Sequence, residues 1–150
     1  MEGFRCIVDC DQEELDENVE MMTSPIPWSL GSSWPSGELP KEGEEAEIPP
    51  GAWIEFDICE TPILKSLTIN GRLSFMNEAT ECVNRTIHAY WVYVRAGELL
   101  IGNSSTPYVA EGNAEIRLYG EPEEETLAPS MLVEFGNKGL FIVNKVEMYG

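Results

Sequence analysis

Basic residues are scarce in this sequence. Nine lysines and arginines stand against 27 aspartates and glutamates, which gives a net charge of −18 at pH 7. Nucleic acids and anionic membrane surfaces are bound through clustered lysine and arginine, so we expect neither as a partner. Histidine is also scarce, because His88 is the single one. In its apolar strand we interpret His88 as a packed residue, since no partner triad or second metal ligand accompanies it.

Long apolar runs are missing as well. No stretch approaches the roughly 20 residues that cross a bilayer. The N-terminus has no basic segment followed by an apolar core, so the sequence predicts neither a signal peptide nor direct membrane insertion. With 150 residues and 43% hydrophobic content, the protein is nevertheless long enough to form one domain with one buried core.

The cysteines favour a location outside the cytosol. They form an even set that allows three pairings. We favour Cys6–Cys10 with Cys59–Cys82, because the first two are close in sequence and the last two flank successive strand pairs. Four reduced thiols are an alternative, and a four-cysteine zinc site is a weaker one because the C-x3-C pair has no matching second pair.

Two sequons support the same location. Asn84-Arg-Thr86 and Asn103-Ser-Ser105 are acceptor sequences for N-glycosylation. Because the cysteines and sequons suit a secreted protein while no signal peptide is evident, we expect the sequence to be a piece of a longer secreted or membrane-anchored protein.

Glycine turns join the predicted strands. Residues 67–75 and 94–102 each contain an alternating apolar strand, a glycine turn and a second alternating strand, for which we expect positive φ at the glycine. The unit recurs at spacings of 20, 26, 23 and 30 residues, in the range of solenoid repeats, about Gly51, Gly71, Gly97, Gly120 and Gly150. The sequence therefore predicts an all-β, right-handed, parallel β-helix-like solenoid of stacked strand pairs with an irregular N-terminal cap segment.

Stacked coils of this kind bury a narrow ladder of inward side chains. The expected members are Ile48, Ile54, Phe56, Leu67, Ile69, Leu73, Phe75, Val92, Val94, Leu99, Ile101, Ile116, Leu118, Ile142, Val146 and Met148. Trp28 and Trp34 lie in a Pro/Gly/Ser loop, where we expect them to cap the open end of the first coil. A sugar-stacking platform is the alternative for these two tryptophans.

Carboxylates are the only candidates for chemistry. Polysaccharide-cleaving enzymes use two carboxylates about 5 to 9 Å apart, and Asp57 with Glu55 or Glu60 is the best candidate set. The competing interpretation of Asp57 is a strand-ending residue whose carboxylate caps the turn. We interpret the acidic loop at residues 121–125 as a solvated surface. Calcium stays open as a ligand of this loop, although its residues do not have the spacing of a known calcium motif. No other metal or cofactor is expected.

The ordered set of turn and strand residues resembles the G-eight domain, a family named for its eight glycines. The resemblance is carried by Ser33-Trp34, Leu39-Pro40, Gly43, Ile48-Pro-x-Gly51, Phe56-Asp57, Leu67-x-Ile-x-Gly71-x-Leu73-x-Phe75, Val94-x-x-Gly97-x-Leu99-x-Ile-Gly102, Pro107 and Ala114-x-Ile116-x-Leu118-x-Gly120. Where relatives often carry a double glycine, this sequence has Ala96-Gly97. We therefore divide it into an acidic N-terminal tether (1–27), a G-eight domain (28–120) and the start of a following β-helix coil (121–150).

The resemblance implies a setting as well as a fold. Such domains occur in fibrocystin and fibrocystin-like receptors of cilia and stereocilia, in cell-surface hyaluronidase-type proteins and in protist surface proteins. It implies an extracellular or cell-surface location, with the ciliary membrane included, and the remainder of a larger β-helix following this piece in the sequence. An extracellular protein or a glycan is the expected ligand.

Two function classes follow. The first is a non-catalytic extracellular structural and interaction module, favoured because no nucleophile–base constellation is present. The alternative is the N-terminal part of a carbohydrate-active, hyaluronan-degrading or polysaccharide-binding β-helix protein. The sequence leaves enzymatic activity undecided and favours its absence.

Overall fold

The computed structural model of the protein describes residues 19–78, 81–108, 113–121 and 138–149. These residues form ten strands and one short 3-10 turn, η1 (Gly31–Ser33). The strands are β1 (Ile26–Pro27), β2 (Glu45–Ile48), β3 (Trp53–Phe56), β4 (Leu64–Ile69), β5 (Arg72–Phe75), β6 (Arg85–Val94), β7 (Glu98–Ile101), β8 (Ala114–Leu118), β9 (Gly139–Ile142) and β10 (Lys145–Met148). The all-β prediction is confirmed.

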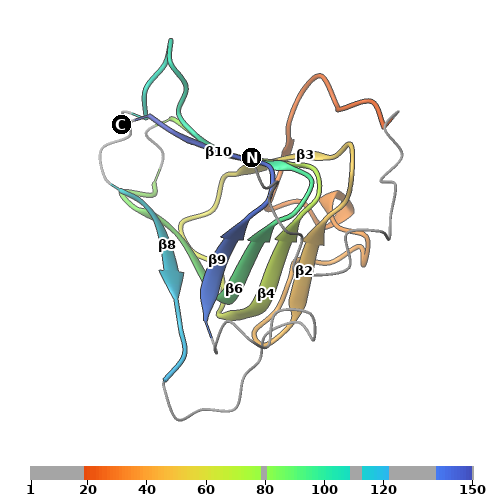
Figure 1. The fold of residues 1–150 in the computed structure, drawn as a ribbon, viewed down its shortest axis with the longest axis vertical. Coiled ribbons are helices and arrows are strands. Elements are labelled where there is room, and N and C mark those ends of the chain that lie inside the picture. The colour runs from red at the N-terminus through yellow and green to blue at the C-terminus, as the bar shows by residue number, and fades with distance from the viewer. Residues whose placement is uncertain (1–18, 79–80, 109–112, 122–137, 150) are drawn as a thin grey trace, which may run out of the picture.

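The strands divide between two parallel sheets. Sheet A has the order β1-β3-β5-β7-β10, and sheet B has the order β2-β4-β6-β8, with β9 also paired to β6. Every pairing between these strands is parallel. Successive pairs such as β2-β3, β4-β5 and β6-β7 therefore give one strand to each sheet, and Figure 1 shows β2, β4, β6 and β9 side by side. The predicted strand pairs and their parallel stacking are present.

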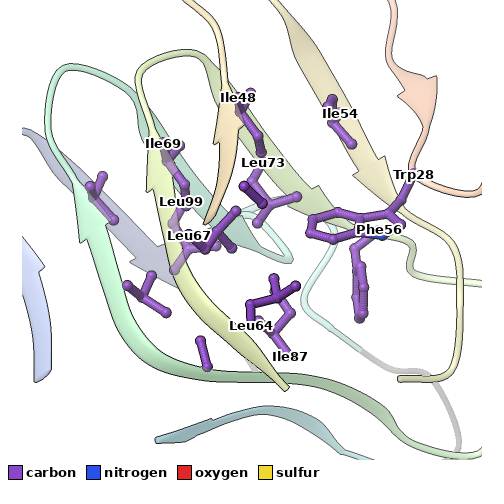
Figure 2. Close-up of a cluster of buried hydrophobic side chains, with 14 of the residues drawn as sticks. Trp28, Ile48, Ile54, Phe56, Leu64, Leu67, Ile69, Leu73, Ile87 and Leu99 are labelled. Atoms are coloured by element: carbon purple, nitrogen blue, oxygen red, sulfur yellow. The ribbon is translucent and has the colours of Figure 1, made fainter. Parts of the chain in front are cut away.

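Inward side chains from the two sheets form the core. In sheet A the register aligns Ile54, Leu73 and Leu99, and in sheet B it aligns Ile48, Ile69 and Val94. All six are fully buried, and Figure 2 shows how most of them meet between the sheets. Each of these apolar groups contributes roughly 1.5–3 kcal/mol when it leaves water. The ladder expected from alternation is therefore the centre of the fold.

At the last strand pair the predicted core is wrong for Ile142 and Met148, whereas Val146 is partly buried against the core. Ile142 and Met148 continue the inward positions of β9 and β10, but they are 50% and 56% exposed. In the part of the protein that the structure describes, no further strand stacks beyond β9 or β10. Alternation gives the direction of a side chain, whereas burial also needs a neighbour on both sides.

Strand β6 changes its buried face along its length. Ile87 and Ala89 belong to the core in its first half, whereas Val92 and Val94 belong to it in the second half. The first half pairs with β8 and the second half with β9. A simple alternation through the strand predicts only one of the two halves, so Ile87 and Ala89 were not expected in the core.

The turn glycines are needed for two different reasons. Gly51 has a φ of 79°, as expected, and Gly120 also has positive φ. Gly71 and Gly97 do not, so the expectation of positive φ is wrong there. A Cβ on Gly97 would lie 1.8 Å from the carbonyl oxygen of Gly71, and one on Gly71 would lie 2.3 Å from that of Ala52. The turns stack so closely that a side chain has no room.

Candidate functional site

The tryptophan loop caps one end of the core. Trp28 is 1% exposed and Trp34 is 5% exposed, with ring centroids 4.5 Å apart. The Trp28 ring also lies 5.1 Å from that of Phe56, and Trp34 Nε1 donates to the carbonyl oxygen of Trp28 at 3.0 Å. The capping prediction is confirmed. Because both indoles are buried, they do not form a platform for a sugar ring.

Asp57 attaches this loop to the end of β3. Its Oδ1 accepts from the backbone N–H of Ser29 at 2.9 Å, and its Oδ2 accepts from the Ser29 hydroxyl at 2.5 Å. Both carboxylate oxygens are therefore used in holding the loop. This geometry matches the interpretation of Asp57 as a strand-ending residue more closely than that of a free nucleophile.

Glu55 lies in a hollow on the outer face of sheet A. The hollow has a volume of about 260 Å³ and receives side chains from β3, β5 and β7 and from the loops that follow β5 and β7. Its lining residues are Trp53, Glu55, Ser74, Phe75, Asn77, Leu100, Gly102, Asn103 and Thr106. An aromatic ring, a carboxyl group and amides thus meet in one concave place on the surface.

Contacts between side chains fix the position of Trp53 in the hollow. Trp53 Nε1 donates to the Ser74 hydroxyl at 2.8 Å. The Arg72 guanidinium lies 4.9 Å from the centre of the Trp53 ring and its Nε donates to Glu98 at 2.9 Å. These contacts fix the indole beside Glu55, so the hollow is preorganised in its aromatic part.

Burial raises the pKa of the Glu55 carboxyl, because a partly desolvated carboxylate is less stable than the acid. The negative charges of Glu78 and Asp57 raise this pKa further, and the positive charge of Arg85 opposes them. A carboxyl group with a raised pKa can donate or accept a proton, which is the property required of a general acid or of a hydrogen-bond donor to a polar ligand.

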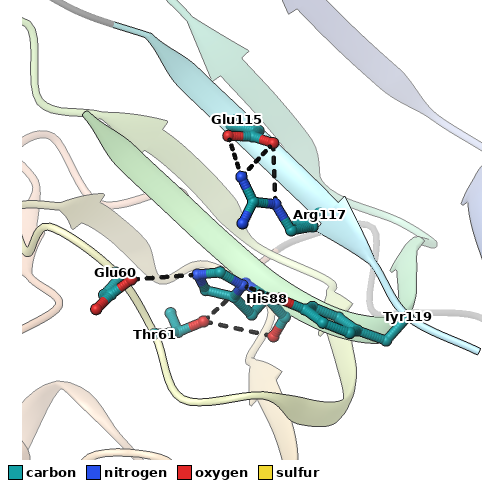
Figure 3. A network of polar contacts seen from close by, with 6 residues as sticks. All are labelled: Glu60, Thr61, His88, Glu115, Arg117 and Tyr119. Carbon is teal, nitrogen blue, oxygen red and sulfur yellow. Dashed lines mark hydrogen bonds and ion pairs between the residues drawn. The ribbon is translucent and has the colours of Figure 1, made fainter.

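Glu60 lies in a different environment, beside His88. Its Oε2 is 3.5 Å from His88 Nε2, while His88 Nδ1 and the Tyr119 hydroxyl are 2.6 Å apart (Figure 3). The backbone N–H of His88 donates to the Thr61 hydroxyl at 2.9 Å. His88 is 8% exposed, as expected of a packed residue. Glu60 thus contacts the outer face of β6, whereas Glu55 lines the hollow over sheet A.

No metal centre is evident in the described residues. Within residues 19–78, 81–108, 113–121 and 138–149, no group of three histidine, cysteine, aspartate or glutamate side chains is arranged to hold a metal ion. The acidic loop considered for calcium lies, except for Glu121, outside the described residues.

Cys59 and Cys82 form a disulfide with their Cα atoms 5.0 Å apart. The bond connects the segment after β3 to the segment before β6, which are the positions where the two cysteines were expected to pair. Cys6 and Cys10 lie outside the described residues, as does the acidic tether up to residue 18.

The two sequon asparagines are both exposed but differ in their surroundings. Asn103 lies in the loop after β7, where its Oδ1 accepts from the backbone N–H groups of Ser105 and Thr106 at 2.9 and 2.7 Å. Asn84 Oδ1 accepts from the Asn113 backbone N–H at 3.0 Å, immediately before β6. A glycan on Asn103 would stand at the rim of the Glu55 hollow.

Sequence reasoning found Glu55 but missed the residues around it. Trp53, Arg72 and Glu98 are aligned by the strand register, as are Glu55, Ser74 and Leu100. Aligning the inward residues of successive strand pairs would have brought these outward neighbours together. The loop residues Asn77 and Thr106 carry no such signal, because their positions depend on loop conformation.

The helical content bears on membrane insertion. Among the described residues, no helical stretch has the length and apolar character of a bilayer span.

Comparisons with known proteins agree on one family. The family model of the G8 domain matches residues 33–150. Fibrocystin-L of Mus musculus is 34% identical over 105 residues, which are 69% of this protein and 2% of that one. The sequence therefore spans a small fraction of the relative's length. No solved structure matches it. The match across most of the sequence shows that this protein belongs to the G8 domain family, which is the family that the ordered set of its turn and strand residues resembled.

Proposed function

We propose that this domain is a non-catalytic structural and interaction module of a large extracellular or cell-surface protein. The observation that carries the proposal is the exposure of Ile142, Val143 and Met148 at 50%, 68% and 56% on the outermost strand pair and the turn that joins it. Apolar groups beside an unpaired strand edge form a surface for another polypeptide segment. The G8 family and the likeness to Fibrocystin-L support the cell-surface setting, and the ciliary membrane is included in the proposed location.

The same proposal interprets the two sheets as coils of a right-handed parallel β-helix. The tryptophan loop closes one end of these coils, and the remainder of a larger β-helix stacks on β9 and β10 at the other. Closed and open ends of this kind are typical of solenoids, in which each coil is stabilised by its neighbours and a terminal coil needs a cap.

Self-association of the 150-residue protein tests the open end. We expect concentration-dependent association in sedimentation velocity, and we expect Ile142→Lys to weaken it because a charge replaces an apolar contact. Leu30→Lys is the matched control, since Leu30 is 49% exposed at the capped end. A protein that stays monomeric at every concentration, or equal effects of the two substitutions, would contradict the interaction surface.

The Glu55 hollow favours a second candidate, the carbohydrate-active protein. Trp53 supplies an aromatic ring and Glu55 a carboxyl group with a raised pKa, which are components of glycan sites. An array of neutral and anionic oligosaccharides, with calcium and with chelator, tests binding, and a turnover assay on hyaluronan tests cleavage. Binding or cleavage lost in Glu55→Gln and kept in Glu42→Gln, an exposed glutamate, would favour this candidate. Absence of both would leave the structural module.

A further inference from the structure

The outer edge of β2 faces a groove. Strand β2 is the terminal strand of sheet B and pairs only with β4 among the described strands. Beside it lies a hollow of about 470 Å³, within the usual range of ligand sites. Its lining residues are Trp34, Pro35, Ser36, Pro40, Glu44, Glu45, Ala46 and Glu47. The groove thus runs between the loop after η1 and the free edge of a strand.

The free edge offers backbone hydrogen-bonding groups. In a parallel ladder, the backbone groups of alternate residues point to opposite sides of the strand. The Ile48 carbonyl accepts from the Asn70 N–H at 2.9 Å, so Ile48, and by alternation Ala46, bond toward β4. The N–H and C=O groups of Glu45 and Glu47 consequently point toward the open edge. An extended segment can pair with these groups as an added strand.

Carboxylates surround the same edge. Glu44, Glu45 and Glu47 all line the groove and are exposed. Glu45 contacts Lys65 Nζ at 2.6 Å, whereas Glu47 accepts from the uncharged Asn70 amide at 2.8 Å. The groove therefore has an excess of negative charge, in a protein whose net charge is −18. A segment with lysine or arginine is attracted to this site, and an acidic one is repelled.

The corresponding edge of sheet A is closed differently. There β1 is only two residues long and contains Pro27, which has no N–H to donate, and the buried tryptophans cover the coil beside it. Nothing comparable blocks β2 among the described residues, and its wall toward the groove includes Trp34, Pro35 and Pro40. The exposed Pro35 and the half-buried Pro40 can contact the aliphatic stems of basic residues, whereas the indole of Trp34 is buried behind them.

We propose that the open edge of β2 is a docking site for an extended, cationic peptide segment of another protein, which adds to sheet B as a further strand. The acidic N-terminal residues of this protein do not suit the site, because Asp9, Asp11 and Glu13 carry the same charge as the groove. The proposal is independent of the open end at β9 and β10.

Synthetic peptides test the proposal by isothermal titration. The probe is acetyl-Thr-Lys-Val-Lys-Val-Lys-Thr-amide, and the comparison peptide has glutamate in place of each lysine. We expect the lysine peptide to bind at least about tenfold more tightly, and its affinity to fall as salt is raised from about 50 to about 500 mM. Equal binding of the two peptides, or no binding of the lysine peptide at about 1 mM, would overturn the proposal.

Backbone methylation separates strand addition from simple charge attraction. Two versions of the probe carry N-methyl groups on alternate residues, one set on the lysines and the other on the valines. Only one set can face β2 in an added strand, so we expect one version to lose binding by about tenfold or more and the other to retain it. Equal losses in both versions would show that no strand is added.

Protein variants complete the test. Glu47→Pro removes an N–H at the open edge and spares the ladder to β4, and Glu47→Gln removes only the charge. We expect both variants to weaken binding of the lysine peptide. Glu47→Pro should weaken this binding at high salt as well, because it removes a backbone donor. The control Glu147→Gln, on β10, should leave binding unchanged. If Glu47→Pro instead abolishes self-association of the protein without affecting the peptide, the occupant is a second copy, and the cationic segment is excluded.

Discussion

The two ends of the stacked strand pairs differ in how their apolar groups are covered. At the end formed by β1 and β3, Trp28 and Trp34 are buried and Asp57 fastens their loop. At the end formed by β9 and β10, Ile142 and Met148 occupy equivalent inward positions and remain half exposed. Both ends carry the same alternating pattern. The difference therefore lies in the presence of a covering segment, and stability should be distributed accordingly.

Truncation of Trp28 should produce the largest effect. It is fully buried between Trp34 and Phe56, so Trp28→Ala is expected to lower the free energy of unfolding by about 3–5 kcal/mol. Met148→Ala at the open end is expected to change it by less than about 0.5 kcal/mol. Urea unfolding followed by far-UV circular dichroism measures both. Similar losses in the two variants would mean that the ends do not differ in covering.

Removal of the disulfide should have the next largest effect, in the capped half. Cys59 and Cys82 are 23 residues apart, and a loop of that length corresponds to about 3 kcal/mol in the loop-entropy account. The double variant Cys59→Ala/Cys82→Ala is expected to lose this amount in urea unfolding without reductant. Treatment of the parent protein with a reductant serves as the control and should produce a comparable loss. An unchanged midpoint in both cases contradicts the role of the bond.

The clamp between Asp57 and Ser29 should contribute less, because it is exposed to solvent. We expect Asp57→Asn to destabilise the protein by about 1 kcal/mol, since the accepted hydrogen bonds lose their charge. Ser29→Ala and the double variant complete a thermodynamic cycle. The two single effects should not add, because the two residues share one interaction. Strictly additive effects would show that Asp57 acts elsewhere.

Glu55 should give the smallest effect, and one that depends on pH. Its raised pKa means that the folded protein holds this proton more tightly than the unfolded state does. The stability so gained is complete below the ordinary value of 4.5 and is lost as the pH rises through the raised pKa. Glu55→Gln should therefore be slightly more stable than the parent at pH 7 and equal to it below about pH 4. Urea midpoints of the parent and Glu55→Gln across this pH range measure the effect, with Glu42→Gln as the control. A difference between parent and Glu55→Gln that grew toward low pH would contradict the prediction.

The sequence predicted the repeated part of the fold better than its ends. Alternation identified Ile54, Leu73 and Leu99 because each is flanked by equivalent strands. It missed the change of buried face in β6, since the two halves of the strand pair with different neighbours, β8 and β9, and residue type does not reveal this. The strand-and-turn pattern predicted positive φ at Gly97, but this glycine is needed because the backbone of Gly71 approaches it closely. That approach depends on stacking between turns that are far apart in the sequence.

The candidate site was predictable only in part for a related reason. Glu55 and Asp57 were singled out by their place beside an apolar strand. Alternation cannot show that Ser29 donates to Asp57, or that Glu55 lines the hollow. Those outcomes depend on loops that fold back from distant positions. The groove at β2 was not expected either, since it exists only because the loop containing Pro35 and Pro40 stands away from the strand.

The shared edge of β6 has a consequence for how the protein can vary. Strand β8 leaves that edge after Leu118 pairs with Ala89, and β9 returns to it where Gly139 pairs with Trp91, so Leu118 and Gly139 lie at neighbouring positions along β6. A connection between two neighbouring positions can be lengthened or replaced without moving either strand, and each doubling of its length costs only about 0.6 kcal/mol of closure entropy. This position is therefore suited to accept an inserted segment or a whole foreign domain while the stack of strands is kept.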